Sequence, residues 1–370
     1  METIISSPKP SLLFEAQQSL NAEFKDVFGW AMARTYGDTV QEQQGVRERV
    51  GLIDLSYYGV IKIAGKEAAQ FLNGLVTNDV KTLETHKGMR AAFLTGHGKV
   101  RGLCRILRCQ DYFLLINDPQ THEKIFKYIF PFSYAGDFHV DDVSEQFRTL
   151  SLQGPKATAV LKEISFEPVP ALAENGWVHT VIGGHQVMTV RTSHTGESGF
   201  DILVADSGLK DLWDFILLKG AFHGLTPVGL DALEALRIEA GIPVYGIDVD
   251  ESNMMLEIGM TDAVSFTKGC YTGQEAVAMA TYRGHISKKL SGLLIEGERL
   301  PTIGSKVSKD GKEIGQVTSA TRSITTGGII ALAYIKYGYF DSGNHLQVQD
   351  AGGMLPSRVT ELPFYQNLPA

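Results

Sequence analysis

The residues with the clearest chemical potential lie in Lys268-Gly-Cys-Tyr-Thr-Gly-Gln-Glu275. Cys270 is one of only three cysteines in the chain, and Lys268 lies two positions before it. Thr272 to Glu275 has the spacing of a capping box, which predicts a helix start there. Cys270 would then precede a helix N-terminus, where positive partial charge and Lys268 favour the thiolate. We interpret Cys270 and Lys268 as candidate catalytic residues, although a lone cysteine can also be a small buried hydrophobe.

Several other polar and aromatic residues could bind a ligand. Glu197 lies in a glycine-flanked turn, and its carboxylate could accept two parallel hydrogen bonds or simply be solvated. Arg237 lies in an apolar helical stretch and needs a partner, either an internal acid or the carboxylates of a ligand. Asn78 could orient a ligand through its amide or serve as a turn residue. Tyr58 and Tyr245 could stack on a flat ligand or pack in a core.

Composition limits the classes of function. A formal net charge of −8 argues against direct nucleic-acid binding, which requires clustered basic residues. The three scattered cysteines form neither a disulfide pattern nor a zinc pattern, so we expect a reducing compartment. His194, His223 and His285 lack ligand spacing, and we expect no metal site. The first residues lack an apolar segment, and no run reaches the roughly 20 apolar residues of a membrane span. We therefore expect a cytoplasmic protein without membrane contact.

The order of predicted elements suggests two regions. Apolar spacing predicts a helix over residues 12–24, and Asp38 could cap a second helix to about Arg49. Residues 90–117 read as a three-stranded meander, followed by alternating strands and helices. After about residue 285, five short strands separated by turns predict a small barrel. We expect two interleaved α+β domains in residues 1–285 and a β-barrel domain in residues 286–370.

Five sequence patches stand out, namely Gly51–Ser56, Leu75–Asp79, Thr195–Asp201, Gly229–Gly246 and the octapeptide Lys268–Glu275. Taken together, they resemble the glycine-cleavage T-protein (aminomethyltransferase) superfamily over about residues 25–365. Within it, the octapeptide resembles the signature of the YgfZ-type folate-binding branch. The resemblance implies an α+β fold in which three domains form a cloverleaf around a folate channel, with an all-β barrel-like C-terminal domain.

The same resemblance implies that the chain binds tetrahydrofolate. The family's folate-binding glutamate falls on Glu197, whose carboxylate matches the amino group and adjacent ring N–H of a reduced pterin. Asn78 and Arg237 also fall on family folate positions. We add Tyr58 and Tyr245 as candidate stacking residues.

The chain departs from the aminomethyltransferases at Gly98-Lys-Val-Arg-Gly-Leu-Cys104. Those enzymes carry a Gly-Gly-x-x-Asp-Asp motif here, and its first aspartate is taken as catalytic. The two carboxylate positions fall on Gly102 and Leu103, neither of which can exchange a proton. The interval from Gly98 to Arg108 contains no acidic residue at all.

Three functions follow as hypotheses. The first is a YgfZ-like protein that binds folate and assists iron–sulfur cluster assembly or repair in client proteins, including tRNA-modifying radical-SAM enzymes. Its working thiol would be Cys270. The alternative is a tetrahydrofolate-dependent aminomethyltransferase or methyltransferase, in which Glu257 or Asp262 could supply the missing carboxylate. The third is a non-catalytic interaction scaffold. The sequence does not indicate an oligomeric state.

Overall fold

The computed structural model describes residues 7–283 and 286–367, which form two compact units. Each unit combines segments that lie far apart in the sequence. The first unit contains the residues up to Gly59 and Val143–Glu234, and the second contains Val60–Asp142 and Ala235–Asn367.

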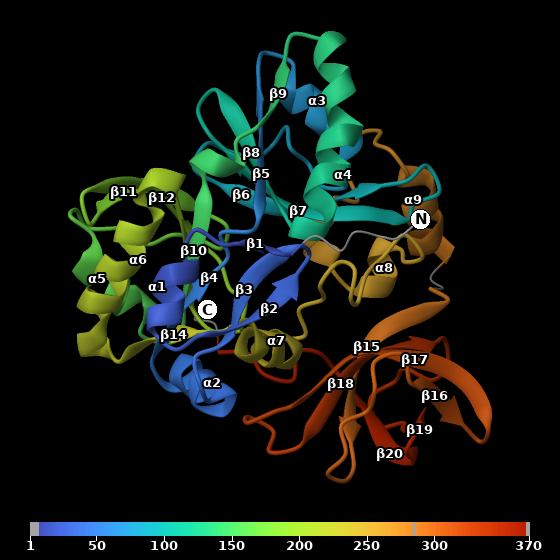
Figure 1. The fold of residues 1–370 in the computed structure, drawn as a ribbon. Coiled ribbons are helices and arrows are strands. Elements are labelled where there is room, and N and C mark those ends of the chain that lie inside the picture. Colours follow the sequence, from blue (N-terminus) through green and yellow to red (C-terminus); the bar gives the residue numbers. More distant parts are fainter. Residues whose placement is uncertain (1–6, 284–285, 368–370) are drawn as a thin grey trace. The chain divides into compact units, whose positions relative to one another are not determined.

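A six-stranded sheet with the order β11-β12-β13-β10-β4-β14 forms the centre of the first unit (Figure 1). Alternate residues of β13, Phe200 and Ile202, join a buried core with Trp213 of α6. The intervening Asp201 faces the other side of the sheet, because successive strand side chains point to opposite faces. The elements are β4 (Val50–Asp54), β10 (Arg148–Gln153), α5 (Ala157–Ile164), β11 (Trp177–Ile182), β12 (His185–Arg191), β13 (Gly199–Val204), α6 (Asp206–Gly220) and β14 (Leu225–Val228).

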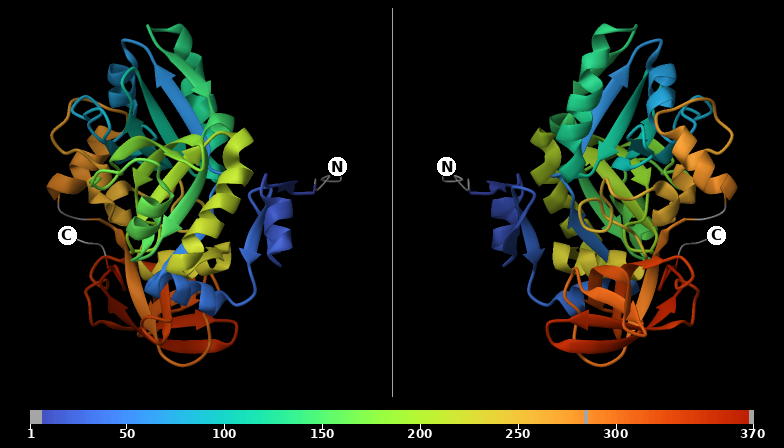
Figure 2. Two further views of the ribbon diagram at one scale, coloured as in Figure 1. Left: turned by 90° about the vertical axis from the view of Figure 1, so that its left-hand side faces the viewer. Right: turned by 90° about the vertical axis from the view of Figure 1, so that its right-hand side faces the viewer.

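The N-terminal part of the first unit forms a small sheet with the order β1-β3-β2 (Figure 2, blue). The helix predicted over residues 12–24 is too long, because the observed helix ends at Ser19. Asn21, two residues later, adopts a left-handed φ of 61° that a helix cannot continue through. The helix predicted after Asp38 is confirmed, and the Asp38 carboxylate accepts from the N–H groups of Val40 and Gln41. The elements are β1 (Lys9–Pro10), α1 (Phe14–Ser19), β2 (Glu23–Val27), β3 (Trp30–Thr35) and α2 (Thr39–Glu48).

The second unit contains a five-stranded sheet with the order β6-β7-β8-β5-β9. Its three antiparallel strands β6, β7 and β8 confirm the predicted meander. Helix α4 packs on β7, and its Ile125 belongs to the same buried core as Leu72 and Ile106 (Figure 1). The elements are β5 (Gly59–Ala64), α3 (Ala68–Leu75), β6 (Gly88–Leu94), β7 (Val100–Arg108), β8 (Tyr112–Asn117), α4 (Pro119–Ile129) and β9 (His139–Asp142).

The C-terminal part of the second unit is a closed barrel with the order β15-β18-β17-β16-β19-β20. The α+β class with a barrel-like C-terminal domain is therefore confirmed. The sequence missed β16, whose stretch Lys-Val-Ser-Lys is short and has one apolar residue, Val307, which is fully buried. The strands are β15 (Lys288–Ile295), β16 (Lys306–Lys309), β17 (Lys312–Arg322), β18 (Ile329–Lys336), β19 (His345–Asp350) and β20 (Gly353–Thr360).

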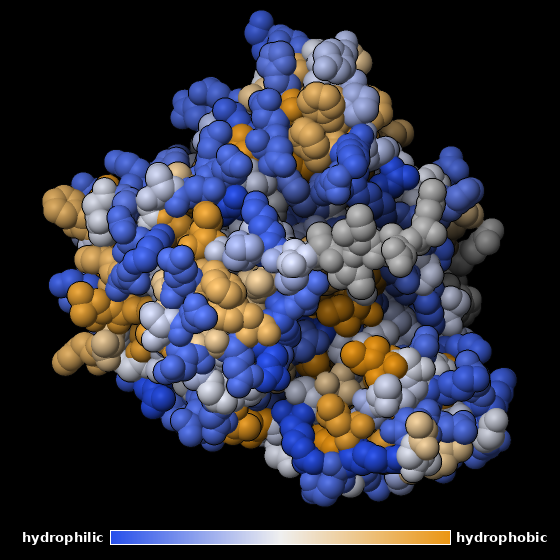
Figure 3. All heavy atoms as spheres, viewed as in Figure 1, coloured by the Kyte–Doolittle hydropathy of each residue, from blue (hydrophilic) through white to orange (hydrophobic). Residues whose placement is uncertain are grey.

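The outer surface of the barrel is mainly hydrophilic on the side shown in Figure 3. Strand alternation explains this, since Leu346 and Val348 of β19 are buried while the residues beside them are more exposed. The described residues also form three further α-helices, namely α7 (Leu230–Glu239), α8 (Met255–Ile258) and α9 (Gln274–Arg283). Four short 3-10 helices lie between these elements, namely η1 (Phe130–Tyr134), η2 (Ser144–Gln146), η3 (Ala221–His223) and η4 (Thr261–Ala263).

No helix in residues 7–283 or 286–367 combines the length and the apolar character needed to cross a membrane. The domain boundary predicted at about residue 285 and the histidine at that position lie outside the described residues.

Candidate functional site

Glu197 lies in the loop between β12 and β13, and its side chain is fully buried. Arg47, in the last turn of α2, donates from Nη1 to Glu197 Oε1 at 3.2 Å and to the Thr195 carbonyl at 2.7 Å. A buried carboxylate needs such a partner to remain charged. Arg47 thus fixes the loop through the Thr195 carbonyl and positions the Glu197 carboxylate. The sequence did not reveal this residue, because nothing in α2 marks one arginine as facing a loop 150 positions away.

A buried amide, Gln153, supports the same loop. Its Oε1 accepts from the His194 N–H at 3.0 Å and from the Thr195 hydroxyl at 3.2 Å. Its Nε2 donates to the Thr192 carbonyl at 3.2 Å. The last glycine of the Thr-Gly-Glu-Ser-Gly motif, Gly199, is required by this packing, because a Cβ there would overlap the Gln153 amide. The loop is therefore fixed by buried hydrogen bonds rather than by solvent-exposed turns.

His194 and Asp201 form a side-chain pair beside this loop. His194 Nε2 lies 3.0 Å from each carboxylate oxygen of Asp201, and Asp201 is only 2% exposed. The sequence suggested only a metal-ligand role for His194, which its spacing made improbable, and did not indicate this pair. Seven residues separate the two, and their proximity depends on how the loop folds back onto β13.

Tyr58 belongs to the first unit as well. Its ring is half-buried and packs edge-to-face on Tyr57 with 5.3 Å between the centroids. Its N–H donates to the Leu55 carbonyl at 3.0 Å, which closes a turn after β4. Stacking of Tyr58 on a ligand remains a prediction.

Lys268 belongs to the second unit and is 8% exposed. Its Nζ donates to the carbonyls of Asn73 at 2.7 Å, Val76 at 2.8 Å and Asn78 at 2.7 Å. These carbonyls lie at and just after the C-terminal end of α3, where backbone acceptors lack helical partners and a positive charge is favoured. Burial lowers the pKa of Lys268 to about 8. The ammonium group therefore fixes the turn that carries Asn78.

Cys270 is exposed, whereas Cys104 and Cys109 are buried. Helix α9 begins at Gln274, one residue later than a capping box with Thr272 as the N-cap predicts. Gly273 precedes it with a φ of 80°, and a Cβ there would lie 2.6 Å from the Thr95 carbonyl oxygen. Glycine is thus needed for this approach, and Cys270 lies in the turn before it.

Asn78 connects two segments of the second unit. Its Nδ2 donates to the carbonyls of Arg90 and Asp262, each at 2.9 Å. The side chains of these two residues form an ion pair, with Arg90 Nε 2.7 Å from Asp262 Oδ2. The predicted alternative carboxylate, Asp262, is therefore paired with a guanidinium.

Arg237 lies at the centre of a buried network. Its Nη1 donates to Asp248 Oδ2 at 2.6 Å and its Nη2 to the Ser319 hydroxyl at 2.7 Å. The Ser319 hydroxyl in turn donates to Asp248 Oδ1 at 2.6 Å. Arg237 is 3% exposed, so this network satisfies a charge that burial would otherwise penalise. The network joins α7 to barrel strand β17.

Tyr245 is 7% exposed and packs in an apolar cluster that also contains Leu103, Val249 and Met255. Its hydroxyl accepts from Lys124 Nζ at 3.3 Å. The structure thus gives Tyr245 a core position within the second unit.

Gly102 and Leu103, the positions where the two carboxylates were expected, are both closely packed against neighbouring side chains. A Cβ on Gly102 would lie 2.9 Å from Ile125 Cδ1 and 3.2 Å from Thr121 Cβ. Leu103, on the opposite face of β7, is 8% exposed and joins the apolar cluster of Tyr245. The second unit therefore offers no room for a carboxylate at position 102 without movement of α4 side chains.

The predicted site residues thus fall in both units. Glu197 and Tyr58 belong to the first unit, and the structure brings Glu197 together with Arg47. In the second unit, Lys268 holds the turn of Asn78, whereas Arg237 and Tyr245 occupy separate clusters.

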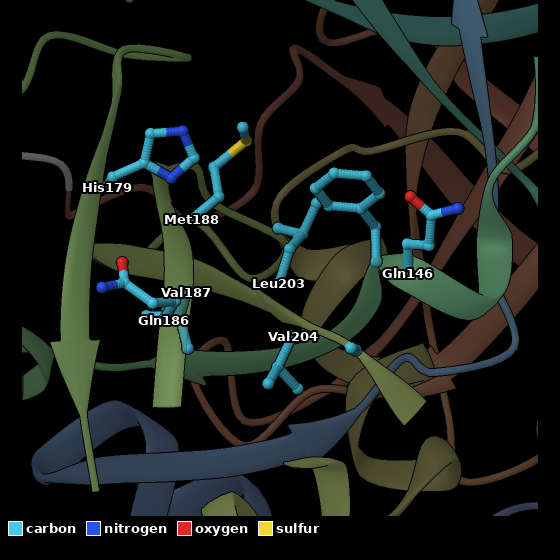
Figure 4. A pocket seen from close by; sticks show the side chains of 9 residues that line it. Gln146, His179, Gln186, Val187, Met188, Leu203 and Val204 are labelled. Atoms are coloured by element: carbon cyan, nitrogen blue, oxygen red, sulfur yellow. The ribbon is translucent and has the colours of Figure 1, made fainter. Parts of the chain in front are cut away.

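An open pocket of about 410 Å³ lies on the first unit at the end of β13 opposite to the Glu197 loop (Figure 4). His179 and Met188 extend from neighbouring strands toward its space, and none of the predicted site residues lines it. Within residues 7–283 and 286–367, no group of three or more His, Cys, Asp or Glu residues could hold a metal ion.

Comparison with known proteins defines the family. The model of the GCVT N-terminal domain matches residues 13–268, and that of the glycine cleavage T-protein C-terminal barrel domain matches residues 288–366. The chain belongs to the glycine cleavage T-protein family.

Relatives match the chain from end to end. An aminomethyltransferase of Lysinibacillus sphaericus is 31% identical over 97% of this chain and 98% of its own length. An aminomethyltransferase of Caldanaerobacter subterraneus is 32% identical over 97% of this chain and 96% of its own length. The crystal structure of the glycine cleavage system aminomethyltransferase T from Bartonella henselae has a similar fold, with a TM-score of 0.90 at 24% identity over 97% of this chain and 99% of that one.

These comparisons correct the first functional hypothesis. The prediction of an iron–sulfur assembly protein with Cys270 as its working thiol is wrong, because the full-length relatives reported above are named aminomethyltransferases. The iron–sulfur prediction depended on the octapeptide Lys268–Glu275 alone. A resemblance of eight residues is weaker evidence of function than similarity over 360 residues. The comparisons give no support to the prediction that iron–sulfur proteins are partners of this chain.

Proposed function

We propose that the protein is a tetrahydrofolate-dependent aminomethyltransferase, which transfers a one-carbon unit from an amine donor to the folate. Full-length similarity to aminomethyltransferases at about 30% identity carries this proposal. The buried Glu197 carboxyl group supports it, because it pairs with Arg47 and a carboxylate has two oxygens that can accept parallel hydrogen bonds from a reduced pterin.

Within this proposal, Glu197 binds the pterin ring. Asn78 orients the folate and Tyr58 contributes aromatic surface, whereas the buried Tyr245 packs in the apolar cluster of Leu103. Arg237 maintains the folate site through its network with Asp248 and Ser319, or releases that network to bind folate carboxylates. Lys268 positions Asn78, because its ammonium group donates a hydrogen bond to the Asn78 carbonyl. A chemical role for the exposed Cys270 stays a prediction.

The reaction needs a proton acceptor other than the family's aspartate, because Gly102 and Leu103 carry no acid. Glu257 is 3% exposed and accepts from the Met254 N–H at 3.0 Å and the Ser287 hydroxyl at 2.8 Å. Asp262 is paired with Arg90. Both predicted replacements thus have structural roles in the second unit.

Other predictions stay as they were made from the sequence. They comprise the division into residues 1–285 and 286–370, the cytoplasmic location, and the absence of direct nucleic-acid binding. The likeness of Lys268–Glu275 to the YgfZ-type branch also remains, without an iron–sulfur function.

The test of folate binding is anaerobic calorimetric titration of tetrahydrofolate into the wild type and Glu197→Gln. The substitution keeps the side-chain volume and removes the charge, so we expect binding at least about tenfold weaker, from a charge-assisted bond worth about 1.5–3 kcal/mol. Glu313→Gln, on an exposed barrel strand, is the control and should bind as the wild type does. A wild type that does not bind tetrahydrofolate refutes the proposal, and equal binding by Glu197→Gln refutes the role of Glu197.

A further inference from the structure

His194, in the loop of Glu197, and Asp201, in β13, form a second pair of ionisable side chains in this part of the first unit. Asp201 is buried on the sheet face opposite the hydrophobic core, whereas the His194 side chain is 17% exposed. A buried carboxylate that holds a partly exposed imidazole is the arrangement that orients a base in acid–base catalysis. The pair is separate from the Arg47–Glu197 pair, which has its own partners.

The geometry defines which ring nitrogen can accept a proton. Nε2 lies 3.0 Å from both oxygens of Asp201. An ionised carboxylate only accepts hydrogen bonds, so Nε2 carries the hydrogen and the lone pair of the neutral ring is on Nδ1. The backbone of His194 is also fixed, because its N–H donates to Gln153 Oε1 at 3.0 Å. The imidazole is therefore anchored through Nε2, and the backbone of His194 is anchored through its N–H.

Its position along the chain links it to the proposed folate site. His194 lies three residues before Glu197, and Gln153 holds His194 and Thr195 together in that loop. A loop fixed by Gln153 and Arg47 presents its two functional side chains with little freedom, which favours catalysis by orientation. The second unit, in contrast, has no carboxylate at positions 102 and 103.

We propose that His194, oriented by Asp201, is the general base of the one-carbon transfer in this chain, an inference that rests on the proposed function. His194 Nδ1 accepts the proton that a secondary amine of the reduced folate loses as its nitrogen bonds to the donor's methylene carbon. The bond between that carbon and the sulfur of the lipoyl donor breaks, the sulfur keeps the electron pair, and the imidazolium returns the proton to it. The second folate amine then displaces the remaining amino group, which leaves as ammonia with that amine's proton, so methylenetetrahydrofolate forms without an oxidant or reductant.

The first test compares His194→Gln with the wild type in the transfer of a one-carbon unit from an aminomethylated lipoyl carrier. A glutamine amide N–H can still donate to Asp201, so the fold is retained, but glutamine has no basic nitrogen. We expect kcat to fall about 100-fold or more while KM for tetrahydrofolate stays within about threefold. His223→Gln, on another element of the first unit, is the control and should keep the wild-type kcat.

The second measurement does not depend on activity. Nitrogen-15 NMR of the ring should show Nε2 protonated and Nδ1 unprotonated in the wild type, with the Nδ1 resonance shifting when tetrahydrofolate is added. Asp201→Asn should abolish the preference for this tautomer. The opposite tautomer, or an Nδ1 resonance that ignores the folate, overturns the assignment.

The outcomes separate the two proposals. An active wild type together with an active His194→Gln overturns the role of His194 and leaves the transferase function standing. An inactive wild type overturns the proposed function and the general base with it. Loss of kcat in His194→Gln with unchanged thermal stability and folate binding supports both.

Discussion

A side chain at position 102 would meet Ile125, because an added Cβ would lie 2.9 Å from the Ile125 Cδ1 atom. Gly102 occupies the position where aminomethyltransferases are expected to carry their catalytic aspartate. In this chain, that position faces α4 and its hydrophobic core instead of presenting a carboxylate. The packing of β7 against α4 therefore leaves little room for a side chain at position 102, and the proposed transferase reaction takes its acid–base group from elsewhere.

Restoring the aspartate should harm the fold. Gly102→Asp places a carboxylate against Ile125 and Thr121, and we expect it to lower the free energy of unfolding by about 3 kcal/mol. Gly102→Ala should cost about 1 kcal/mol, because the end of Ile125 can shift. Urea denaturation measures both. A Gly102→Asp protein with wild-type stability and increased transferase activity would contradict this account.

Lys268 should titrate well below an ordinary lysine. Burial lowers its pKa from 10.5 to about 8, so the folded protein releases this proton while the unfolded chain still holds it. Between about pH 8 and 10.5 the unfolded state binds more protons, and the contribution of Lys268 to stability therefore rises with pH. We expect the stability difference between the wild type and Lys268→Met to change in that direction. A carbon-13 Cε resonance, identified by its absence in Lys268→Met, should have its midpoint near pH 8, and a midpoint near 10.5 would refute the prediction.

The buried Arg237–Asp248 ion pair should contribute more to the free energy of unfolding than an exposed ion pair does. Arg237→Met leaves the buried Asp248 carboxylate without its guanidinium, and we expect a loss of about 3–5 kcal/mol. Arg322→Met, which breaks an exposed ion pair with Glu298, should cost less than about 1 kcal/mol. Chemical denaturation of the two variants measures the contrast. Equal effects would show that the network does not carry the predicted energy.

The three thiols should differ in reactivity. Cys270 is exposed, whereas burial raises the pKa of Cys109 to about 11 and raises that of Cys104 further. Only the thiolate is nucleophilic, so we expect one thiol to react rapidly with an aromatic disulfide reagent in the native protein. Cys270→Ser should remove this reaction and change stability by less than about 0.5 kcal/mol. Rapid reaction of a second thiol, or of none, is the contrary result.

Local sequence patterns predicted much of the fold. Asp38 marked the start of α2 correctly, because an N-cap acts through its own neighbours. The alternating strands of the meander and most of the barrel were also recognised. The helix predicted over residues 12–24 failed at Asn21, where a single left-handed residue ended the helical pattern. The prediction missed strand β16, because a four-residue stretch with a single apolar residue, Val307, gives almost no hydrophobic signal.

The candidate site was harder to predict because it depends on contacts between distant residues. The motif around Glu197 indicated a binding carboxylate, but its partner Arg47 lies 150 residues earlier. Lys268 was recognised as unusual, yet its three carbonyl partners come from the end of α3, about 190 residues away. The spacing of His194 from other histidines excluded a metal site, but its pairing with Asp201 depends on how the loop folds back onto β13.

The most direct test of the central claim is an anaerobic transfer assay with a carbon-13-labelled aminomethylated lipoyl carrier and tetrahydrofolate. We expect labelled methylenetetrahydrofolate to form with the wild type, and its rate to fall at least about tenfold with Glu197→Gln at a fixed, subsaturating folate concentration. Glu313→Gln should match the wild type. If the wild type forms no labelled folate above the uncatalysed rate, the chain is not an aminomethyltransferase and the proposed function is contradicted.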